Sequence, residues 1–195
     1  MREVDAGAPG GESIASFTGR LAARTPTPGG GSAAALAAAL GAALGEMVLA
    51  YSIDPKSPLP ELEALAPRLT AARRRFLELV DEDARSYDAV RAAKKRRKES
   101  PGAEADAAYL AAVRNAAEVP LATARLATEL SAALEAVGTK TKAALGSDLV
   151  TAVALFRAAT DGALANVAIN LEDLRAAGAS VSEIEPEIAR LRPKA

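Results

Sequence analysis

The chain has 195 residues, enough for one domain of ordinary size, and 50% of them are hydrophobic. It contains no histidine and no cysteine, which excludes disulfides, Ser-His-Asp and Cys-His catalysis, and the usual ligands of zinc, copper and non-haem iron. Its formal net charge of −1 provides no overall field that would attract nucleic acid or an anionic membrane.

The N-terminal part is predicted to hold two helices separated by a loop. Residues 1–12 are rich in glycine and proline and are expected to be flexible, so the single domain is assigned to 13–195. Ser13 is a candidate N-cap for a short helix to Ala23. The alanine-rich segment 32–51 could pass for a membrane span, but Glu46 and the weak hydrophobicity of alanine favour a buried helix of a cytoplasmic protein without membrane contact.

Four further helices are predicted after a loop at 53–60 that holds three prolines. Pro120 is expected to kink or break one of them after Val119. Ser147 is read as an N-cap, and Ser182 with Glu185 as a capping box. The predicted helices span about 62–98, 103–137, 147–176 and a short last segment that starts after Ser182. The sequence therefore predicts an all-α protein, a helical bundle of about six helices that includes one or two long kinked helices. Its small alanine side chains suggest further burial against a second subunit.

The segment Pro28-Gly29-Gly30-Gly31-Ser32 stands directly before the alanine-rich helix. Glycines there allow bare N–H groups to be presented at a helix N-terminus, a geometry that favours anions. No strand precedes the segment and no Gly-Lys-Ser/Thr follows, so neither a dinucleotide fold nor a P-loop is supported. A flexible loop with Ser32 as N-cap is the alternative interpretation.

Asp83 is the one carboxylate on an apolar stripe of the long helix. Phe76, Val80, Asp83, Tyr87 and Val90 follow steps of four and three residues and share one face. Partial burial there would raise the pKa of the carboxyl toward values useful in general acid–base catalysis. The alternative is a carboxylate paired with a neighbouring helix or lying at the edge of the bundle. Other charged residues nearby fall off the stripe: Glu78, Asp81, Glu82 and Arg85.

Two other polar features allow both functional and structural interpretations. Asn166 and Asn170 lie four apart on an apolar helix, where they suit an amide-like heterocycle or a hydrogen bond between helices. The basic run 94–98 closes the long helix, where cations suit the helix dipole and a solvated face is expected. It has no interleaved aromatic residues, so nucleic-acid binding is not predicted.

Seven segments in this order resemble the formimidoyltetrahydrofolate cyclodeaminase / methenyltetrahydrofolate cyclohydrolase family, the fold of the C-terminal half of formiminotransferase-cyclodeaminase. The resemblance covers about residues 13–175. The segments are Ser16-Phe17, Pro28 to Ser32, Met47-Val48, Val80 to Ala84, Glu118 to Leu121, Ser147-Asp148-Leu149 and Asn166 to Leu171.

The resemblance implies an all-α homodimer with a reduced-folate pocket between subunits, no metal, and no cofactor beyond the folate itself. It implies an essential aspartate, which maps onto Asp83, in agreement with the stripe. Lys56 and Tyr87 are candidates to assist. The residues expected to bind substrate are Pro28, Gly29, Gly30, Gly31, Ser32, Asp148, Asn166 and Asn170.

The expected reaction closes the ring of 5,10-methenyltetrahydrofolate: N10 attacks the formimino carbon on N5, and ammonia departs. Asp83 would act first as base and then as acid. Hydrolysis of the methenyl compound by the same pocket is the alternative. A catalytically degenerate folate binder or structural homodimer also stays open, because the chain departs from the family pattern at Ile53 to Lys56, Gly138-Thr139 and Tyr109 to Ala112.

Overall fold

The computed structural model describes residues 12–192, so the segment 1–11 that was expected to be flexible lies outside the described residues. The described chain is all-α and has no strand beyond one isolated bridge between Asp54 and Ser57. This confirms the predicted helical bundle. The helices are α1 (Ile14–Leu21), α2 (Gly30–Ser52), α3 (Pro60–Glu99), α4 (Ala103–Val137), α5 (Gly146–Ala176) and α6 (Glu185–Leu191), with two short 3-10 turns at Gly138–Lys140 and Ala143–Leu145.

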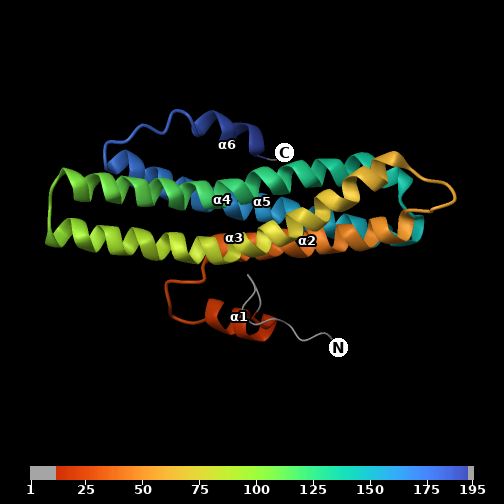
Figure 1. Ribbon diagram of the computed structural model, residues 1–195, viewed down its shortest axis with the longest axis horizontal. Coiled ribbons are helices and arrows are strands. Elements are labelled where there is room, and N and C mark those ends of the chain that lie inside the picture. Colours follow the sequence, from red (N-terminus) through yellow and green to blue (C-terminus); the bar gives the residue numbers. More distant parts are fainter. Residues whose placement is uncertain (1–11, 193–195) are drawn as a thin grey trace.

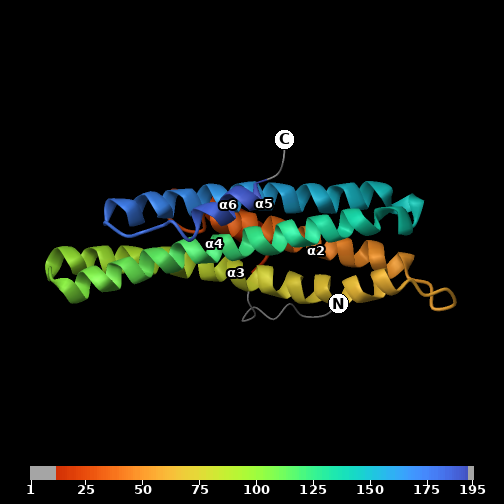
Figure 2. The same cartoon turned by 90° about the horizontal axis from the view of Figure 1, so that it is seen from above.

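The four long helices pack in cyclic order, α2 against α3, α3 against α4, α4 against α5, and α5 against α2. The α3–α4 hairpin is longer than its neighbours and reaches beyond the first turn of α2 (Figure 1). Helix α1 lies beside this bundle and buries Phe17 in its core. Helix α6 lies over α4 and α5 (Figure 2), where Ile188 is buried. The start of α2 is therefore surrounded by the middle of α3 and the last third of α5.

Small residues set how closely α2 approaches its neighbours. Ala35, Ala38 and Ala42 are fully buried on its inner face. A Cβ added at Gly41 would lie 3.1 Å from the Ala152 carbonyl of α5, so the two backbones almost touch there. Close approach of alanine-rich helices leaves little room for large side chains.

Several predicted helix starts are wrong in detail. Helix α2 begins at Gly30 with Gly29 as N-cap, so Ser32 is not the cap and its hydroxyl is used elsewhere. Helix α5 follows Leu145 without a side-chain cap, not Ser147. The capping box before α6 is also absent, since Ile184 occupies the N-cap without a side-chain bond. By contrast, Ser13 caps α1 as predicted, its hydroxyl accepting from the Ser16 amide at 3.1 Å.

The predicted break at Pro120 is also wrong, because α4 continues without interruption from Ala103 to Val137. A proline cannot donate to the carbonyl four residues earlier, here that of Ala116. The side chain of Asn170 on α5 supplies that donor instead, at 2.9 Å. A neighbouring helix therefore satisfies the carbonyl that the proline leaves without its helical donor.

Two segments of the described chain are long and apolar enough to cross a bilayer, Gly30–Ser52 and Ala143–Ala176. In the structure both pack in the bundle, with 50% and 39% of their most apolar windows buried against the rest of the chain. Core helices pass the same test of length and composition, so the observation is weak evidence for a membrane.

Candidate functional site

The first turn of α2 meets the middle of α3 through one hydrogen bond between side chains. The Ser32 hydroxyl donates to Oδ2 of Asp83 at 2.8 Å and lies 3.1 Å from the Val80 carbonyl. The two side chains are 51 residues apart in sequence. Ser32 is fully buried, so the bond joins the two helices away from solvent.

The glycines of this turn make room for the carboxylate. A Cβ added to Gly31 would lie 2.1 Å from Oδ1 and 2.7 Å from Cγ of Asp83, which no real side chain tolerates. A Cβ on Gly30 would lie 3.0 Å from Nδ2 of Asn166. The glycine segment therefore serves close approach of two other helices to the start of α2, rather than flexibility.

Two opposing effects act on the acidity of Asp83. Burial raises the pKa of its carboxyl above the ordinary value, and hydrogen bonds from the Ser32 hydroxyl and backbone lower it by less. The carboxylate also faces the N-terminus of α2, whose partial positive charge favours the ionised form. Asp83 can therefore take up a proton more readily than an exposed aspartate, while donors are in place to hold it when ionised.

Two asparagines on α5 form the opposite wall, and their amide orientation is fixed by what they contact. Asn166 Nδ2 donates to the Gly162 carbonyl at 2.8 Å. Asn170 Nδ2 donates to the carbonyls of Ala116 and Asn166, at 2.9 and 3.0 Å. In either case a flipped amide would place oxygen against a carbonyl oxygen.

These elements enclose a pocket of about 300 Å³ between the start of α2, the middle of α3 and α4, and the end of α5. Among the residues 12–192 that line it, two are carboxylates, Asp83 and Asp173, and none is lysine or arginine. The lining residues are Pro26, Thr27, Gly29, Gly30, Asp83, Ser86, Tyr87, Val90, Ala116, Asn166, Ile169, Asn170 and Asp173. The pocket therefore offers mainly hydrogen-bond acceptors and a negative charge.

Most of the site residues predicted from the sequence meet here. Gly29, Gly30, Asp83, Tyr87, Asn166 and Asn170 line the pocket. Gly31 and Ser32 lie behind the Asp83 carboxylate. Pro28 is buried in the preceding loop and is not among the lining residues.

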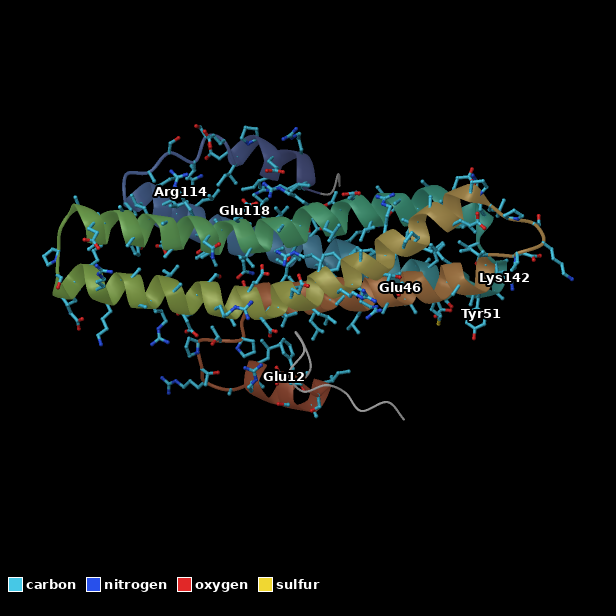
Figure 3. The ribbon with its side chains drawn as sticks, in the orientation of Figure 1. Glu12, Glu46, Tyr51, Arg114, Glu118 and Lys142 are labelled. Carbon is cyan, nitrogen blue, oxygen red and sulfur yellow. The ribbon has the colours of Figure 1, made fainter. Side chains whose placement is uncertain are left out.

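Lys56 and Asp148 do not join the pocket within one chain. Lys56 follows the C-terminal end of α2, and Gly30 begins this helix of 23 residues, which is about 34 Å long at the rise of an α-helix. Asp148 stands in the first turn of α5, some 18 residues or about 27 Å before Asn166. Both lie toward the end of the bundle where Figure 3 shows Tyr51 and Lys142.

Seven lining residues were not predicted as site residues: Pro26, Thr27, Ser86, Val90, Ala116, Ile169 and Asp173. Asp173 continues the spacing of Asn166 and Asn170 by three residues, so the helical pattern contained a signal for it. Ser86 is buried and donates to the backbone carbonyl of Asp83 at 2.8 Å. The carbonyl of Ala116 is available to Asn170 because Pro120 has no N–H to donate to it. An alanine side chain by itself gives no signal of this role.

Comparisons with known proteins identify the family of this chain. Residues 13–190 match the family described as formiminotransferase-cyclodeaminase. A methenyltetrahydrofolate cyclohydrolase of Methylorubrum extorquens is 33% identical over 189 residues, covering 92% of this chain and 90% of that protein. The formimidoyltransferase-cyclodeaminase of Sus scrofa is 35% identical over 167 residues, and the match spans only 31% of its length.

A solved structure gives the same result for the fold. The crystal structure of formiminotetrahydrofolate cyclodeaminase from Thermotoga maritima superimposes with a TM-score of 0.76 at 25% identity, covering 92% of this chain and 86% of that one. Sequence and structure matches thus extend over nearly the whole bundle, including the turn that holds Asp83. The chain belongs to the one-carbon folate family of cyclodeaminases and cyclohydrolases.

Proposed function

We propose that the protein converts 5-formimidoyltetrahydrofolate to 5,10-methenyltetrahydrofolate with release of ammonia, using Asp83 as general acid and base. The observation that carries the proposal is the position of this carboxylate. It lies on the wall of a polar pocket, its pKa is raised by burial, and donors from Ser32 hold its ionised form. A group of this kind can accept and return a proton within one turnover.

The reaction needs two proton transfers, and one carboxylate supplies both. N10 attacks the carbon of the protonated formimino group, forming the N10–C bond and leaving the former imino nitrogen as an NH2 group, and the proton of N10 passes to Asp83. The C–N bond to the former imino nitrogen then breaks, and Asp83 returns the proton to that nitrogen, which leaves as ammonia. The remaining N5–C–N10 unit carries the positive charge of the methenyl product, and the balance requires no further cofactor.

The charge of the pocket supports a cationic ligand at the reacting centre. A protonated formimidoyl group and the methenyl bridge are both cations, and the pocket contains two carboxylates without a lysine or arginine among its lining residues. Opposite charge in a partly desolvated pocket stabilises such a group more than it would in water.

Methenyltetrahydrofolate hydrolysis is the second candidate, favoured by one specific observation. The cyclohydrolase of Methylorubrum extorquens matches over 90% of its own length. In this reaction water adds to the methenyl carbon, and Asp83 takes one proton from that water. Asp83 returns this proton to N5 as the C–N5 bond breaks, and the remaining hydroxyl proton is released to solvent as the carbonyl of the 10-formyl compound forms. The same residues serve both reactions because each adds a nucleophile to the bridging carbon.

We further propose that α2 pairs with a second copy of the chain. Apart from Gly30 and Glu46, every α2 residue that is not fully buried is apolar. Leu40 is 48% exposed and Tyr51 62% exposed on this face, and Ile169 on neighbouring α5 is 62% exposed beside the pocket. An apolar face of two adjacent helices is characteristic of homodimer interfaces, and this one runs to the rim of the pocket.

A spectrophotometric assay with both substrates tests the function. The wild-type protein is expected to form the methenyl compound from 5-formimidoyltetrahydrofolate, to hydrolyse it, or to do both, each at a rate that falls in Asp83→Asn. Lack of activity on both, together with a rise in melting temperature on adding tetrahydrofolate, would identify a degenerate folate binder. For the dimer, Leu40→Glu is expected to give a monomer by light scattering, and a wild-type monomer at micromolar concentration would contradict it.

A further inference from the structure

We propose that Asn170 is fixed as a hydrogen-bond acceptor for the N–H edge of the pterin ring, and that Pro120 on α4 is the positioning residue that fixes it. The inference rests on the proposed reduced-folate substrate. It begins from the two hydrogen bonds of the Asn170 amide. Nδ2 carries two hydrogens, and the carbonyls of Ala116 and Asn166 accept them at 2.9 and 3.0 Å.

With both donors used, Oδ1 is the one polar atom of Asn170 that remains for a ligand. A flip of the amide would set Oδ1 against two carbonyl oxygens and leave both N–H groups without these partners, so the orientation is strongly held. Asn170 lines the pocket. It therefore presents an acceptor there, although an asparagine in general can present either kind of group.

The identity of residue 120 explains why Ala116 can hold Asn170 in this way. In an ordinary helix the amide of residue 120 would donate to the Ala116 carbonyl. Proline has no such hydrogen, and its ring pushes the carbonyl four residues earlier away from the helix axis. That carbonyl faces α5 and takes its hydrogen bond from Asn170. Pro120 thus acts on the pocket through a neighbouring backbone atom without lining it.

A second acceptor lies one turn further along α5. Asp173 lines the pocket three residues after Asn170, and the two positions share a face of the helix. The pyrimidine part of a reduced pterin presents two adjacent donors, the ring N3–H and the 2-amino group. Two acceptors on one helix face match this pattern, Asn170 Oδ1 accepting from the 2-amino group and the Asp173 carboxylate from N3–H, and a carboxylate strengthens it. The match places the pyrimidine edge against α5 and leaves N5 and N10 for Asp83 on α3.

The decisive variant is Pro120→Ala. Removing a proline from a helix interior is expected to raise the melting temperature, because it restores a helical hydrogen bond. The same change returns the Ala116 carbonyl to the helix and loosens Asn170, so the affinity for 5-formyltetrahydrofolate, measured by calorimetry, is expected to fall about three- to tenfold. A protein that gains stability and loses affinity is not explained by damage to the fold.

Pro67→Ala is the matched control, since Pro67 also lies inside a long helix but outside the pocket. It is expected to raise the melting temperature without changing the affinity. Asn170→Ala is expected to weaken binding about tenfold, and Pro120→Ala added to it should have no further effect on affinity. With a 2-desamino-2-methyl analogue of the ligand, the loss caused by Asn170→Ala should largely disappear.

The outcomes separate this inference from the proposed function. If the wild type binds 5-formyltetrahydrofolate and Pro120→Ala binds it equally well, the positioning role of Pro120 is wrong. If Asn170→Ala binds equally well, or loses as much affinity for the desamino analogue, recognition of the donor edge is wrong. If the wild type binds no reduced folate at all, the proposed substrate itself fails.

Discussion

Helices α2 and α5 begin alike in sequence and differently in structure. Each opens with glycine followed within two residues by serine, and neither has a side-chain N-cap. At the start of α2, Asp83 arrives from another helix and is bonded by Ser32. At the start of α5, the nearby acid is Asp148, which belongs to the helix itself.

This difference indicates that the N-terminus of α2 is a candidate site because Asp83 from α3 approaches it. A glycine at the start of the helix is not sufficient, since α5 also begins with one. A Cβ at Gly146 would meet nothing within 4 Å, whereas one at Gly31 would overlap the Asp83 carboxylate. The N-terminus of α2 thus contacts the Asp83 carboxylate, a group whose burial costs free energy and which is difficult to replace. The N-terminus of α5 serves only to start a helix within this chain.

Replacing Asp83 should have the largest effect on turnover. Asp83→Asn is expected to lower turnover about 10²- to 10⁴-fold, the usual span for a lost general acid or base, with little change in folate affinity. Asp81→Asn, two residues away and off the apolar stripe, is the control and should retain most of the activity in the same spectrophotometric assay. Equal loss in both variants would contradict the assignment to Asp83.

Adding a methyl group at Gly31, beside the Asp83 carboxylate, should have the next largest effect on activity. Gly31→Ala is expected to displace the Asp83 carboxylate and lower kcat/KM by about 10- to 100-fold, with a lower melting temperature. Gly146→Ala is the matched control at the start of α5, where the same methyl group has room. It is expected to leave activity unchanged and to stabilise the protein by about 0.4–1 kcal/mol. Similar behaviour of the two variants would remove the contrast between the two helix starts.

Removing only the hydrogen bond between Ser32 and Asp83 should show how much this bond contributes at the start of α2. Ser32→Ala takes away a donor that lowers the pKa of Asp83, so that pKa should rise further. If the ionised form is the active base, the acid side of the pH–rate profile moves to higher pH. The rate at neutral pH is expected to fall about three- to tenfold. A profile that does not move would show that Asp83 does not control the acid side.

The smallest expected effect concerns stability. Burial raises the pKa of Asp83, so the folded protein binds this proton more tightly than the unfolded chain does. The contribution of Asp83 to stability is therefore present at low pH and is lost as pH rises from the ordinary value of 3.8 through the raised value. The melting temperature of Asp83→Asn minus that of the wild type should grow over this window and then level off. A constant difference would mean that the pKa of Asp83 is not raised.

The sequence predicted this site where the signal was local and missed it where the signal was long-range. The stripe from Phe76 to Val90 identified Asp83 because helical periodicity is contained in one segment. The role of Ser32 could not be predicted in the same way, since its partner lies 51 residues away. Ser32 was instead expected to bind substrate, with an N-cap as the alternative, which is the most frequent use of a serine at such a position.

Pro120 and Lys56 show two further limits of sequence patterns. The rule that proline breaks a helix is local, and it failed at Pro120, where Asn170 on another helix satisfies the Ala116 carbonyl. The order of motifs along the chain gave no distances, so Lys56 was grouped with Asp83 although the whole of α2 separates them. The fold itself was predictable because almost every element is a long helix with a clear apolar face.

Because Tyr87 lies on the pocket wall, the intrinsic tyrosine fluorescence of the protein can report the binding of a ligand. The chain has no tryptophan and three tyrosines, so all intrinsic fluorescence arises from Tyr51, Tyr87 and Tyr109. Only Tyr87 lines the pocket, where it is 44% exposed. In a Tyr51→Phe, Tyr109→Phe background it becomes the single emitter of the molecule. Quenching of that emission by a bound pteridine would then follow occupancy of this one site in real time, without any added label.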